Sequence, residues 1–515
     1  MTSLAHLDQL SADQLRSLSA ELLQRVTRQD ERLAEQDKTI RHHEVVNEKL
    51  NYELALLRRH RFGRRSETLS PDQGNLLDEL IDTDIAAIEV ELEQQAAILN
   101  PAKVKQRQPK RTVLPAELPR TVITHEPENT QCACGCALRR IGEDVSEKLD
   151  YVPGVLNVEQ HIRGKWVCDH CDTLTQAPVP AQVIDKGIPT SGLLAHVLVA
   201  KYADHLPLYR QEHIFARAGH AIPRSTLADW VGRCGVELQP LVDALRDRLL
   251  KETVLHGDET PVPMLSPGKK KTHQAYVWAF ASTRASAVQG VVYEFKESRA
   301  GKHARAFLQD WRGSLVCDDF SGYKASFTQG VTEAACWAHA RRKFYDLLDS
   351  KKSQIAEQAL HYIGQLYQIE AYCKPLPAVE KQPIRQSQSA PIIDALYQWL
   401  IAQRQRVPKG SPISKAIHYT LKRWPALARY LDDGNLPIDN NWVENQIRPW
   451  ALGRNNWLFA GSLRGGQRAA AVMSLIQSAK INGHDPYAYL KDVLARLPTQ
   501  KASAIDELLP HNWRA

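Results

Sequence analysis

Residues 254–262 read VLHGDETPV, an apolar start that runs into a cluster of polar residues around Asp258. The segment 253–259 is rich in β-branched and apolar residues, which predicts a strand that ends in acids. A single aspartate after a strand is more often a turn residue or a helix cap than a catalytic group. A chemical role for Asp258 therefore depends on which other acids the fold brings beside it.

The sequence downstream of this segment predicts an α/β core. Strand-like runs occupy 274–282 and 290–296, a helical stretch follows, and two more strand-like runs lie at 315–323 and at the start of 331–344. Three meandering strands, a helix, and two further strands make a sheet whose functional groups should gather at strand ends. Residues 345–435 are helical and strand-poor, with a Pro/Gln/Ser-rich break at 374–391, which fits a helical insertion.

Three acids stand out on this predicted core. Asp258 follows the first strand, Asp318 follows the fourth strand with Asp319 next to it, and Glu444 lies on a helix that begins near Asp439. Carboxylate oxygens are the ligands that Mg²⁺ and Mn²⁺ prefer, and two such ions can activate an attacking oxygen and stabilise a leaving one in phosphoryl transfer. The three acids together favour a metal-dependent site over a set of turn residues.

The first sixty residues show a heptad pattern. One heptad position holds Val26, Leu33, Ile40, Asn47 and Leu54, which predicts a coiled-coil seam and hence a homodimer or a larger assembly. The partner positions of the seam are polar in its first half. An amphipathic helix packed on its own protein is the alternative.

Basic segments border an acidic helix expected at 75–98. The segment LLRRHRFGRRSE at 56–67 contains five arginines, which we expect to contact DNA phosphates: Arg58, Arg59, Arg61, Arg64 and Arg65. A second segment has five Lys/Arg between 103 and 111 and no acid, and its prolines mark a linker.

Five of the nine cysteines lie between 132 and 171. They form two groups about thirty residues apart, and the stretch between them is β-like: Cys132, Cys134 and Cys136, then Cys168 and Cys171. This spacing predicts a zinc ribbon with a structural Zn²⁺ held by four thiolates. The first group is irregular, so which two of its three cysteines bind the metal stays open.

Residues 190–248 are predicted to be helical again. A turn at Gly219 precedes a helix that opens with Arg224 and Ser225, and Ser225 is a candidate N-cap. This arrangement resembles a helix-turn-helix, in which Arg224 would contact DNA. A plain helical bundle is the alternative.

Composition sets the outer bounds. The chain has 515 residues, a net charge of +7 and an isoelectric point near 8.8, which is only weak support for a nucleic-acid partner. We see no apolar run long enough to span a membrane and no signal-peptide pattern at the N-terminus. Clustered cysteines favour metal over disulfides, and the expected location is the cytoplasm, which the family resemblance given below narrows to the bacterial cytoplasm in association with the nucleoid.

The sequence closely resembles the IS66 family of bacterial insertion-sequence transposases along nearly the whole chain. The segments that carry the resemblance are FGRRSE at 62–67, IGEDVSEKLDYVPG at 141–154, KYADHLPLYRQE at 201–212, HGDETPV at 256–262, CWAHARRKF at 336–344 and IDNNWVENQIRPWALGRNNWLFAGS at 438–462. The resemblance implies a DDE transposase with a ribonuclease-H-like core, whose acids fall on Asp258, Asp318 and Glu444. It also implies a supporting role near the site for Cys336 and His339.

The chain departs from the family pattern at two places. The first cysteine pair is usually Cys-x-x-Cys, whereas Gln131 stands where its first cysteine would be and Cys132 follows. The stretch at 318–320 reads Asp-Asp-Phe where Asp-Gly-Tyr is usual, which makes Asp319 a rival for Asp318.

The activity that the resemblance implies is cleavage of DNA at the ends of the element, followed by transfer of the freed 3′-OH into target DNA. Two Mg²⁺ or Mn²⁺ ions would assist, and companion proteins of the element are possible partners. The arginines after Glu444 are candidate phosphate contacts: Arg448, Arg454, Arg464 and Arg468. For at least two of Trp442, Trp450 and Trp457 we expect core packing rather than stacking on bases. A catalytically inactive DNA-binding regulator and a nuclease without strand transfer are the alternative functions.

The expected fold class is multidomain α+β, a ribonuclease-H-like α/β core with a helical insertion, preceded by a coiled coil, a zinc ribbon and a helix-turn-helix-like domain. The expected domains are a coiled-coil helix at 1–60, a basic and acidic helical and linker region at 61–125, a zinc ribbon at 126–185, a helical DNA-binding domain at 186–250, the first part of the core at 251–345, the insertion at 346–436 and the C-terminal part of the core at 437–515.

Overall fold

A computed structural model of the chain describes residues 12–62, 71–99, 114–127, 129–152, 154–184, 187–266, 272–351, 353–457 and 460–514. It divides into two compact units, which are considered separately: residues 1–67 with 87–110, and residues 68–86 with 111–515. Within the described residues, no helix combines the length and the apolar character needed to cross a bilayer.

The N-terminal unit consists of the long helix α1 (Ala12–Phe62) and the second half of α2 (Pro71–Leu99). His43 contacts Gln95 and Arg58 forms an ion pair with Glu89 at 2.8 Å, so the two helices run antiparallel. The predicted helix at 75–98 is therefore present. The first basic segment, 56–67, is described only as far as Phe62 at the end of α1, and the second, with its Lys/Arg between 103 and 111, lies outside the described residues.

The predicted heptad seam on α1 has two different halves. Leu50 and Leu54 are buried. Val26, Leu33 and Ile40 are instead 51%, 59% and 44% exposed, so the first half of the seam has no cover within the described part of this unit. Pairing of this half with a second copy of the chain stays a prediction.

A small mixed sheet follows in the second unit, in which β1 runs parallel to β3 and the other pairs are antiparallel. Its strands are β1 (Arg120–His125), β2 (Arg139–Val152), β3 (Val155–Val167) and β4 (Leu174–Gln176). β2 and β3 form a long hairpin, and β1 and β4 both pair with β3. At the base of the hairpin, Leu149 and Val158 join the main core. The opposite end carries the cysteines and has few buried apolar residues.

Four helices lead from this sheet to the larger one: α3 (Ser191–Tyr202), α4 (Leu208–Arg217), α5 (Arg224–Glu237) and α6 (Gln239–Leu249). The buried faces of these helices belong to the same apolar core as the larger sheet. The N-cap of α5 is Pro223 and no side chain caps it, so the expectation that Ser225 caps this helix is wrong. The helix starts two residues earlier than a Ser225 cap would place it, at Arg224, because Pro223 fixes a backbone angle that suits a helix entry.

The larger sheet has five strands in the order β7-β6-β5-β8-β9. They are β5 (Val254–Met264), β6 (His273–Ser282), β7 (Val291–Lys296), β8 (Ser314–Cys317) and β9 (Thr332–Ala335). β5, β6 and β7 form an antiparallel meander, whereas β8 and β9 run parallel to β5. The connections are α7 (Lys302–Leu308) before β8, and η2 (Ser321–Tyr323) with α8 (Lys324–Thr328) before β9.

All five strands predicted from the sequence are present, but two have different bounds. β5 continues past the acids to Met264, because β6 pairs with it along its whole length. β8 ends at Cys317, so the residues to 323 predicted as strand instead form a turn and the 3₁₀ helix η2. The segment after Cys317 leaves the sheet as Asp318 accepts a hydrogen bond from the backbone N–H of Phe320 at 2.9 Å.

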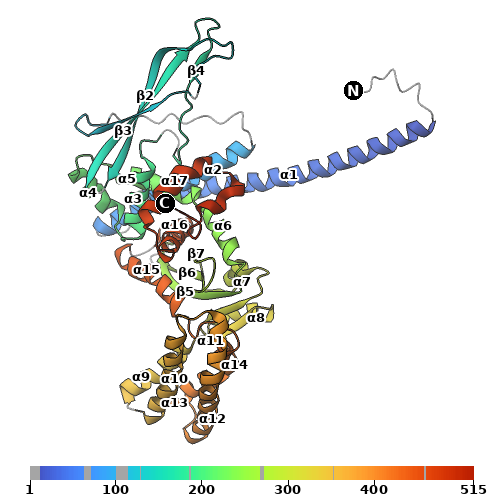
Figure 1. Ribbon diagram of the computed structural model, residues 1–515, viewed down its shortest axis with the longest axis vertical. Helices are drawn as coiled ribbons and strands as arrows, with labels where there is room; N and C mark the ends of the chain where they lie inside the picture. The colour runs from blue at the N-terminus through green and yellow to red at the C-terminus, as the bar shows by residue number, and fades with distance from the viewer. Residues whose placement is uncertain are drawn as a thin grey trace. The chain divides into compact units, whose positions relative to one another are not determined.

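The helical insertion follows β9, and its apolar core is separate from the main one and includes Val254, Val316 and Ala334 of the sheet. Figure 1 shows it as a bundle beyond the five-stranded sheet. Its helices are α9 (Trp337–Lys351), α10 (Gln354–Cys373), α11 (Ala378–Ile384), η3 (Arg385–Ser389), α12 (Ala390–Arg406), α13 (Pro412–Lys422), α14 (Trp424–Ala428) and η4 (Arg429–Leu431).

The break predicted at 374–391 is wrong for most of its length, because residues from Ala378 onward are helical. Buried Arg385 explains this order. Its guanidinium donates to the carbonyl oxygens of Tyr430 and Leu436 and pairs with Glu370, so the π-helical turn η3 is held from several sides.

The chain then returns to the sheet with α15 (Asn441–Trp457), α16 (Leu463–Ile481), α17 (Pro486–Arg496), η5 (Leu497–Thr499) and η6 (Ala502–Leu508). Helix α16 covers the outer edge of β7. The hydroxyls of Ser474 and Ser478 accept hydrogen bonds from the backbone N–H groups of Tyr293 and Val291 at 2.8 and 2.9 Å. These bonds satisfy an edge that would otherwise be open to another strand.

Candidate functional site

Asp258 lies in the middle of β5 and not at its end as the sequence predicted. The ladder with β8 stops at His256, whereas the ladder with β6 continues to Met264. Past His256, one edge of β5 is therefore free of a strand of this sheet. Pro261 and Pro263 fit there because a proline has no N–H to donate to a neighbouring strand. Asp258 thus stands where the sheet opens beside its central strand.

Asp258 and Asp318 follow the paired parts of two neighbouring strands. β5 and β8 pair in parallel from Val254 opposite Ser314 to His256 opposite Val316. Asp258 comes two residues after the last pair on β5, Asp318 is the first residue after β8, and the charge of Asp318 contributes to the raised pKa of the Asp258 carboxyl. The separation in sequence is sixty residues, but the two chain segments are neighbours.

Asp319, the rival acid, has different partners. Its carboxylate forms an ion pair with the buried guanidinium of Arg423 at 3.0 Å and approaches the Lys324 ammonium at 4.0 Å. Arg423 also pairs with Glu333 on β9 at 2.7 Å. Asp319 therefore helps to fasten the insertion to the sheet, which favours Asp318 as the acid of the site.

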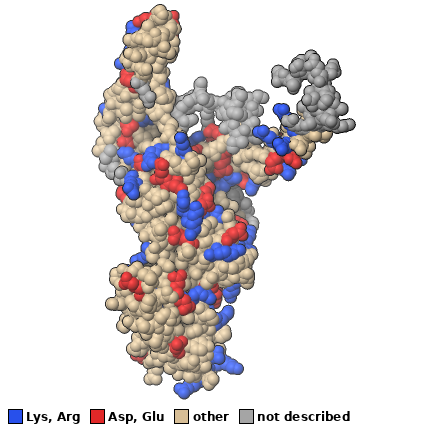
Figure 2. Space-filling model, turned by 45° about the vertical axis from the view of Figure 1, so that its right-hand side comes forward, with Lys and Arg blue, Asp and Glu red and all other residues tan. Residues whose placement is uncertain are grey.

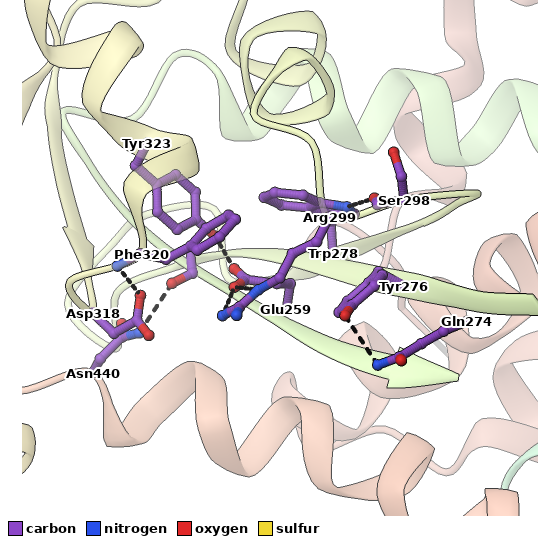
Figure 3. Close-up of polar contacts among 11 residues, drawn as sticks. Glu259, Gln274, Tyr276, Trp278, Ser298, Arg299, Asp318, Phe320, Tyr323 and Asn440 are labelled. Atoms are coloured by element: carbon purple, nitrogen blue, oxygen red, sulfur yellow. Dashed lines mark hydrogen bonds and ion pairs between the residues drawn. The ribbon is translucent and has the colours of Figure 1, made fainter. Parts of the chain in front are cut away.

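Glu444 enters from the first turn of α15, and Asn440 holds that helix on β5. The side-chain oxygen of Asn440 lies 2.8 Å from Nδ1 of His256, and its amide nitrogen donates to the carbonyl oxygen of Gly257 at 3.0 Å. Figure 3 shows Asn440 beneath the end of β8, close to Asp318. Asn440 is completely buried, so its bonds fix the start of α15 against the strand that carries Asp258.

Asn440 was missed by the sequence analysis, and His256 had no assigned role. The signal for Asn440 was its place in the run IDNN just before the Glu444 helix, since Asn is a common residue at helix starts. Its partner on β5 is 184 positions away in sequence, which no local pattern reveals.

The electrostatics of the site follow from crowded acids. Burial raises the pKa of the Asp258 carboxyl well above its usual range, and the charges of Glu259, Glu444 and Asp318 raise it further. Like charges in a partly buried place are unfavourable unless a cation lies among them. Carboxylate oxygens are the donors that a hard divalent cation such as Mg²⁺ or Mn²⁺ prefers, although among the described residues the donor atoms of the three acids do not all lie within 4.8 Å of one another.

Glu259 has a separate, structural set of contacts. Its carboxylate accepts hydrogen bonds from Nε of Arg299 at 2.8 Å and from the Tyr323 hydroxyl at 2.9 Å (Figure 3). The Arg299 guanidinium also lies over the ring of Phe320, 3.9 Å from its centroid. Burial raises the pKa of Glu259 to about 7, and the Arg299 hydrogen bond opposes that shift.

This cluster explains the glycine in HGDE. A side chain at Gly257 would meet the Tyr323 hydroxyl and the Leu315 side chain, both at 3.3 Å. The absence of a side chain lets Tyr323 reach Glu259, and the Gly257 carbonyl oxygen remains available to Asn440. Each of the four residues therefore has its own role. His256 contacts Asn440, Gly257 leaves room for Tyr323, Asp258 is the predicted site acid, and Glu259 forms an ion pair with Arg299.

Cys336 and His339 lie beside Glu444. Donor atoms of these three residues all lie within 4.8 Å of one another. Nδ1 of His339 is 3.7 Å from a carboxylate oxygen of Glu444, and these two buried atoms have no hydrogen-bond partner within the described part of the chain. The Cys336 sulfur accepts a hydrogen bond from the backbone N–H of Asn440 at 3.2 Å. The supporting position expected for Cys336 and His339 is thus consistent with these contacts.

Four of the zinc-ribbon cysteines form a separate cluster, which consists of cysteine sulfurs alone. Sulfur atoms of Cys132, Cys134, Cys168 and Cys171 all lie within 4.8 Å of one another. Three of the separations are 3.1, 3.6 and 3.9 Å. In a tetrahedral site with Zn–S bonds of about 2.3 Å the sulfurs are about 3.8 Å apart, so four thiolates here fit a structural Zn²⁺. Cys136 is not part of the cluster.

The arginines predicted to contact DNA have mixed surroundings. Arg58 is half-exposed and paired with Glu89, Arg224 is half-buried at the start of α5, and Arg448 is exposed on α15. Arg454 donates to the carbonyl oxygen of Pro261 at 3.1 Å, which ties α15 to β5. The side chains of Arg59 and Arg61 are not among those described, and Arg64 and Arg65 lie outside the described residues.

Two of the arginines predicted to contact DNA, Arg464 and Arg468, lie near the start of α16 and differ in their surroundings. Arg464 is half-buried, and its charge acts on the carboxyl of buried Asp84. Arg468 is itself buried and forms an ion pair with Asp84, so the expectation that Arg468 contacts phosphate is wrong. A buried cation with a buried acid partner has no surface left for a ligand.

At least two of the three tryptophans of α15 pack in the protein interior, as the sequence analysis expected. Trp450 is completely buried, and the ring of Trp457 lies against it with centroids 5.5 Å apart. The Trp442 N–H donates to the carbonyl oxygen of Ser282 at 2.8 Å, and the Arg284 guanidinium lies over its ring.

Comparisons with known proteins agree with one family along the chain. Residues 186–468 match the model described as "Transposase IS66 family", and residues 474–511 match "IS66 C-terminal element". Residues 49–123 match "Transposase C of IS166 homeodomain", and residues 129–172 match "zinc-finger binding domain of transposase IS66".

Two relatives come from Sinorhizobium fredii (strain NBRC 101917 / NGR234). The uncharacterized protein y4jD is 38% identical over 486 residues, which cover 90% of this chain and 94% of y4jD. The uncharacterized protein y4qI is 37% identical over 478 residues, which cover 90% of this chain and 88% of y4qI. The similarity therefore extends over nearly the full length of both relatives.

Proposed function

The chain belongs to the IS66 family of transposases, and from this premise we propose that it cleaves and joins DNA by metal-dependent phosphoryl transfer at Asp258, Asp318 and Glu444. The family membership supports a transposase role and DNA as the partner. The reaction and the residues that perform it are the content of the proposal.

One observation carries the proposal. β5 and β8 are neighbouring parallel strands, Asp258 and Asp318 each follow the paired part of their strand, and the Asn440 brace holds the start of the Glu444 helix on β5. These contacts support the proposal that the three acids, far apart in sequence, share one site. Burial is the main cause of the raised pKa of the Asp258 carboxyl, and the charges of Glu259, Glu444 and Asp318 raise it further.

The strand order of the five-stranded sheet supports a ribonuclease-H-like core. An antiparallel meander of three strands, followed by two strands parallel to the first, places the first and fourth strands side by side. Acids on or just after these two strands would then lie near one another, which supports the assignment of Asp258 and Asp318 to one site. We propose this fold assignment together with the activity.

The chain's own residues would position the cation and the DNA. The three carboxylates would hold Mg²⁺ or Mn²⁺, which when bound polarises the scissile phosphate and lowers the barrier to attack by an oxygen nucleophile. The buried brace of His256 and Asn440 would keep Glu444 in place during the reaction. Arg448, exposed on the same helix as Glu444, is available to a DNA phosphate.

The two steps balance without a covalent protein intermediate. In cleavage, a water oxygen bonds to phosphorus and the bond from phosphorus to the 3′-oxygen breaks, so that this oxygen leaves with a proton as a 3′-OH. In joining, that 3′-OH attacks a phosphorus atom of target DNA and displaces the 3′-oxygen there. One site can perform both steps because the bonds made and broken are of the same kind.

The Cys132, Cys134, Cys168 and Cys171 cluster has a different role in this proposal. It would hold a structural Zn²⁺ at the end of the β2–β3 hairpin that has little apolar core, and so keep that module folded for binding element ends.

The test uses purified full-length protein, labelled element-end DNA and Mg²⁺. Wild-type protein should give both cut ends and products joined to a target duplex, and the Asp258→Asn protein should give neither while it still binds DNA. Cut ends without joined products would indicate a nuclease. Binding without either product from wild type would indicate a regulator, and normal joining by Asp258→Asn would overturn the site.

A further inference from the structure

The helical insertion contains a stretch of unusual charge. Residues 395–431 include seven Lys or Arg and no Asp or Glu, so this stretch alone has a formal charge of +7. The whole 515-residue chain has the same net charge. The rest of the chain is therefore neutral on balance, and the positive excess is concentrated in residues 395–431, a stretch for which the proposed function gives no role.

Several of these cations line one groove. It has a volume of about 770 Å³ and lies between the end of α12 and the face of α13. Its cationic side chains are all exposed: Arg404, Lys409, Lys415 and Lys422. Figure 2 shows Lys and Arg side chains along one edge at the lower end of the molecule, where Figure 1 places the insertion.

These four cations lack acidic partners. Within the described residues, no carboxylate lies within ion-pair distance of any of them. The contrast with Arg423 is clear, since that neighbouring arginine is buried and paired with both Asp319 and Glu333. The groove cations are thus not part of the insertion's internal packing, and their mutual repulsion is reduced only by solvent or by a bound anion.

The inner end of the groove reaches the carboxylate site. Asp319 lines the groove, and the next residue toward the N-terminus is Asp318. Tyr419 lines it as well, and the Lys343 ammonium lies over the Tyr419 ring, 5.6 Å from its centroid. The Arg423 ion pairs fix this end of α13 to the sheet, so the groove has a defined start beside the proposed reaction centre.

We propose that this groove, lined by Arg404, Lys409, Lys415 and Lys422, binds the phosphate backbone of the DNA segment that adjoins the scissile phosphate. The inference rests on the proposed function for the position of that phosphate, but the binding itself does not depend on catalysis. The exposed cations begin beside the proposed acids, an arrangement that fits a polyanion such as DNA. The metal at the acids would neutralise one phosphate, and the lysines and the arginine of the groove would neutralise the neighbouring phosphates.

The groove's chemistry favours a nucleic-acid backbone over other anionic ligands. A small anionic metabolite would be enclosed by buried polar groups, whereas this groove is open and its charged side chains are exposed. Lysines supply point charges with mobile stems, which suit phosphates of any sequence and carry no base recognition. Acidic protein partners remain as an outcome of the test.

The experiment measures the salt dependence of DNA binding by full-length protein. The probe is a fluorescein-labelled DNA duplex of mixed sequence, and the readout is anisotropy at several NaCl concentrations. The groove variant is Lys409→Glu with Lys415→Glu. The matched control is Lys374→Glu with Arg406→Glu, which makes the same change in net charge at exposed residues of the insertion that do not line the groove.

The expected result is specific to the groove. Each lost phosphate contact lowers the slope of log K against log salt by about 0.9, so the groove variant should show a slope smaller by about 1.8 and weaker binding. The control should keep the wild-type slope. If the groove variant also kept the wild-type slope, the proposal would be overturned.

Two further arms separate this inference from its alternatives. If the groove variant lost binding to poly-glutamate but kept its DNA slope, the surface would be a protein site and the proposal would fail. If the groove variant lost slope while wild-type protein neither cut nor joined DNA, the groove would stand and the proposed reaction would fail. Asp258→Asn protein should bind with the wild-type slope, because that acid is not part of the groove.

Discussion

The four clustered cysteines and the three acids of the proposed site are two sets of metal-binding residue types, and they are built in opposite ways. The four cysteines come from two tight turns at one end of the small sheet, and they gather where little else is buried. Asp258, Asp318 and Glu444 come from a strand, the turn after another strand and a distant helix, with an apolar core behind them. The cysteines would stabilise a module that has little apolar core, whereas the positions of the acids depend on the apolar core that lies behind them.

This difference predicts how each cluster fails. Removal of a cysteine should unfold its own module and leave the rest of the chain intact. A change in the brace behind the carboxylates should instead leave a folded protein whose reaction centre is displaced. The predictions below test that distinction, beginning with the largest expected effect.

The largest effect is expected for Cys168→Ala, because this cysteine belongs to the cluster and is completely buried. Structural Zn²⁺ contributes about 10–16 kcal/mol to the folding of small zinc modules, and the variant should lose its zinc and the fold of its ribbon. Metal analysis should fall from about one zinc per chain to none, with proteolysis confined to residues near 129–176.

Cys136→Ala is the matched control, since Cys136 lies near the cluster but not in it. It should keep its zinc. Zinc loss in the Cys136 variant, or zinc retention in the Cys168 variant, would contradict the ligand set.

Asn440→Ala should have the next largest effect. The change removes the partner of the His256 ring and of the Gly257 carbonyl oxygen, both in the interior. Two buried groups left without partners cost about 2–4 kcal/mol, so the midpoint of thermal unfolding should fall and DNA cleavage should slow.

Asn441→Ala is the matched control, because it removes the same kind of side chain from the neighbouring position without breaking the contacts to His256 and Gly257. Asn441 is the next residue, is exposed, and bonds locally to Asp439. Its replacement should change neither the unfolding midpoint nor the cleavage rate appreciably. Equal losses in the two variants would show that the brace has no special role.

The smallest predicted effect is a pH dependence from His256. Burial lowers the pKa of this imidazole to about 4, although the Asn440 hydrogen bond opposes the shift. The unfolded chain, with a pKa near 6.5, binds more protons between those values, so stability falls as pH falls from about 6.5 to 4, by up to about 3 kcal/mol.

Glu259 works in the other direction, because its pKa is raised to about 7 and its contribution is lost as pH rises from about 4.5 to 7. The contribution of His256 to the pH dependence of stability is therefore obtained as the difference between wild type and a variant that lacks this ring. Thermal midpoints of wild type and His256→Gln, measured from pH 7.5 to 4, should converge on acidification as wild type loses more. Parallel curves would show that His256 is not a buried neutral ring.

Local patterns predicted much of the molecule. The strand-like runs, the strand-poor insertion and the cysteine groups are signals within short windows, and the corresponding elements are present. Two errors came from partners that a window does not include. β5 runs on to Met264 because β6 supports it, and the helix from Ala378 forms because Arg385 reaches carbonyl oxygens more than forty residues ahead.

The site shows the same limit. Asp258, Asp318 and Glu444 were singled out by their places on predicted elements and by family resemblance, but their mutual arrangement depends on long-range contacts. Asn440 binds His256 across 184 positions, and buried Arg468 turns toward Asp84 across 384. The first residue was overlooked and the second was misassigned to DNA, because the burial that decides each role is a property of the assembled core.

The most direct test of the central claim compares two neighbouring aspartates that differ only in their partners. Single-turnover cleavage of element-end DNA with Mg²⁺ should fall roughly a thousand-fold for Asp318→Asn, which is about 4 kcal/mol of transition-state stabilisation. Asp319→Asn, which loses the ion pairs with Arg423 and Lys324, should stay within about tenfold of wild type. Loss of cleavage in Asp319→Asn with normal cleavage in Asp318→Asn would contradict the account.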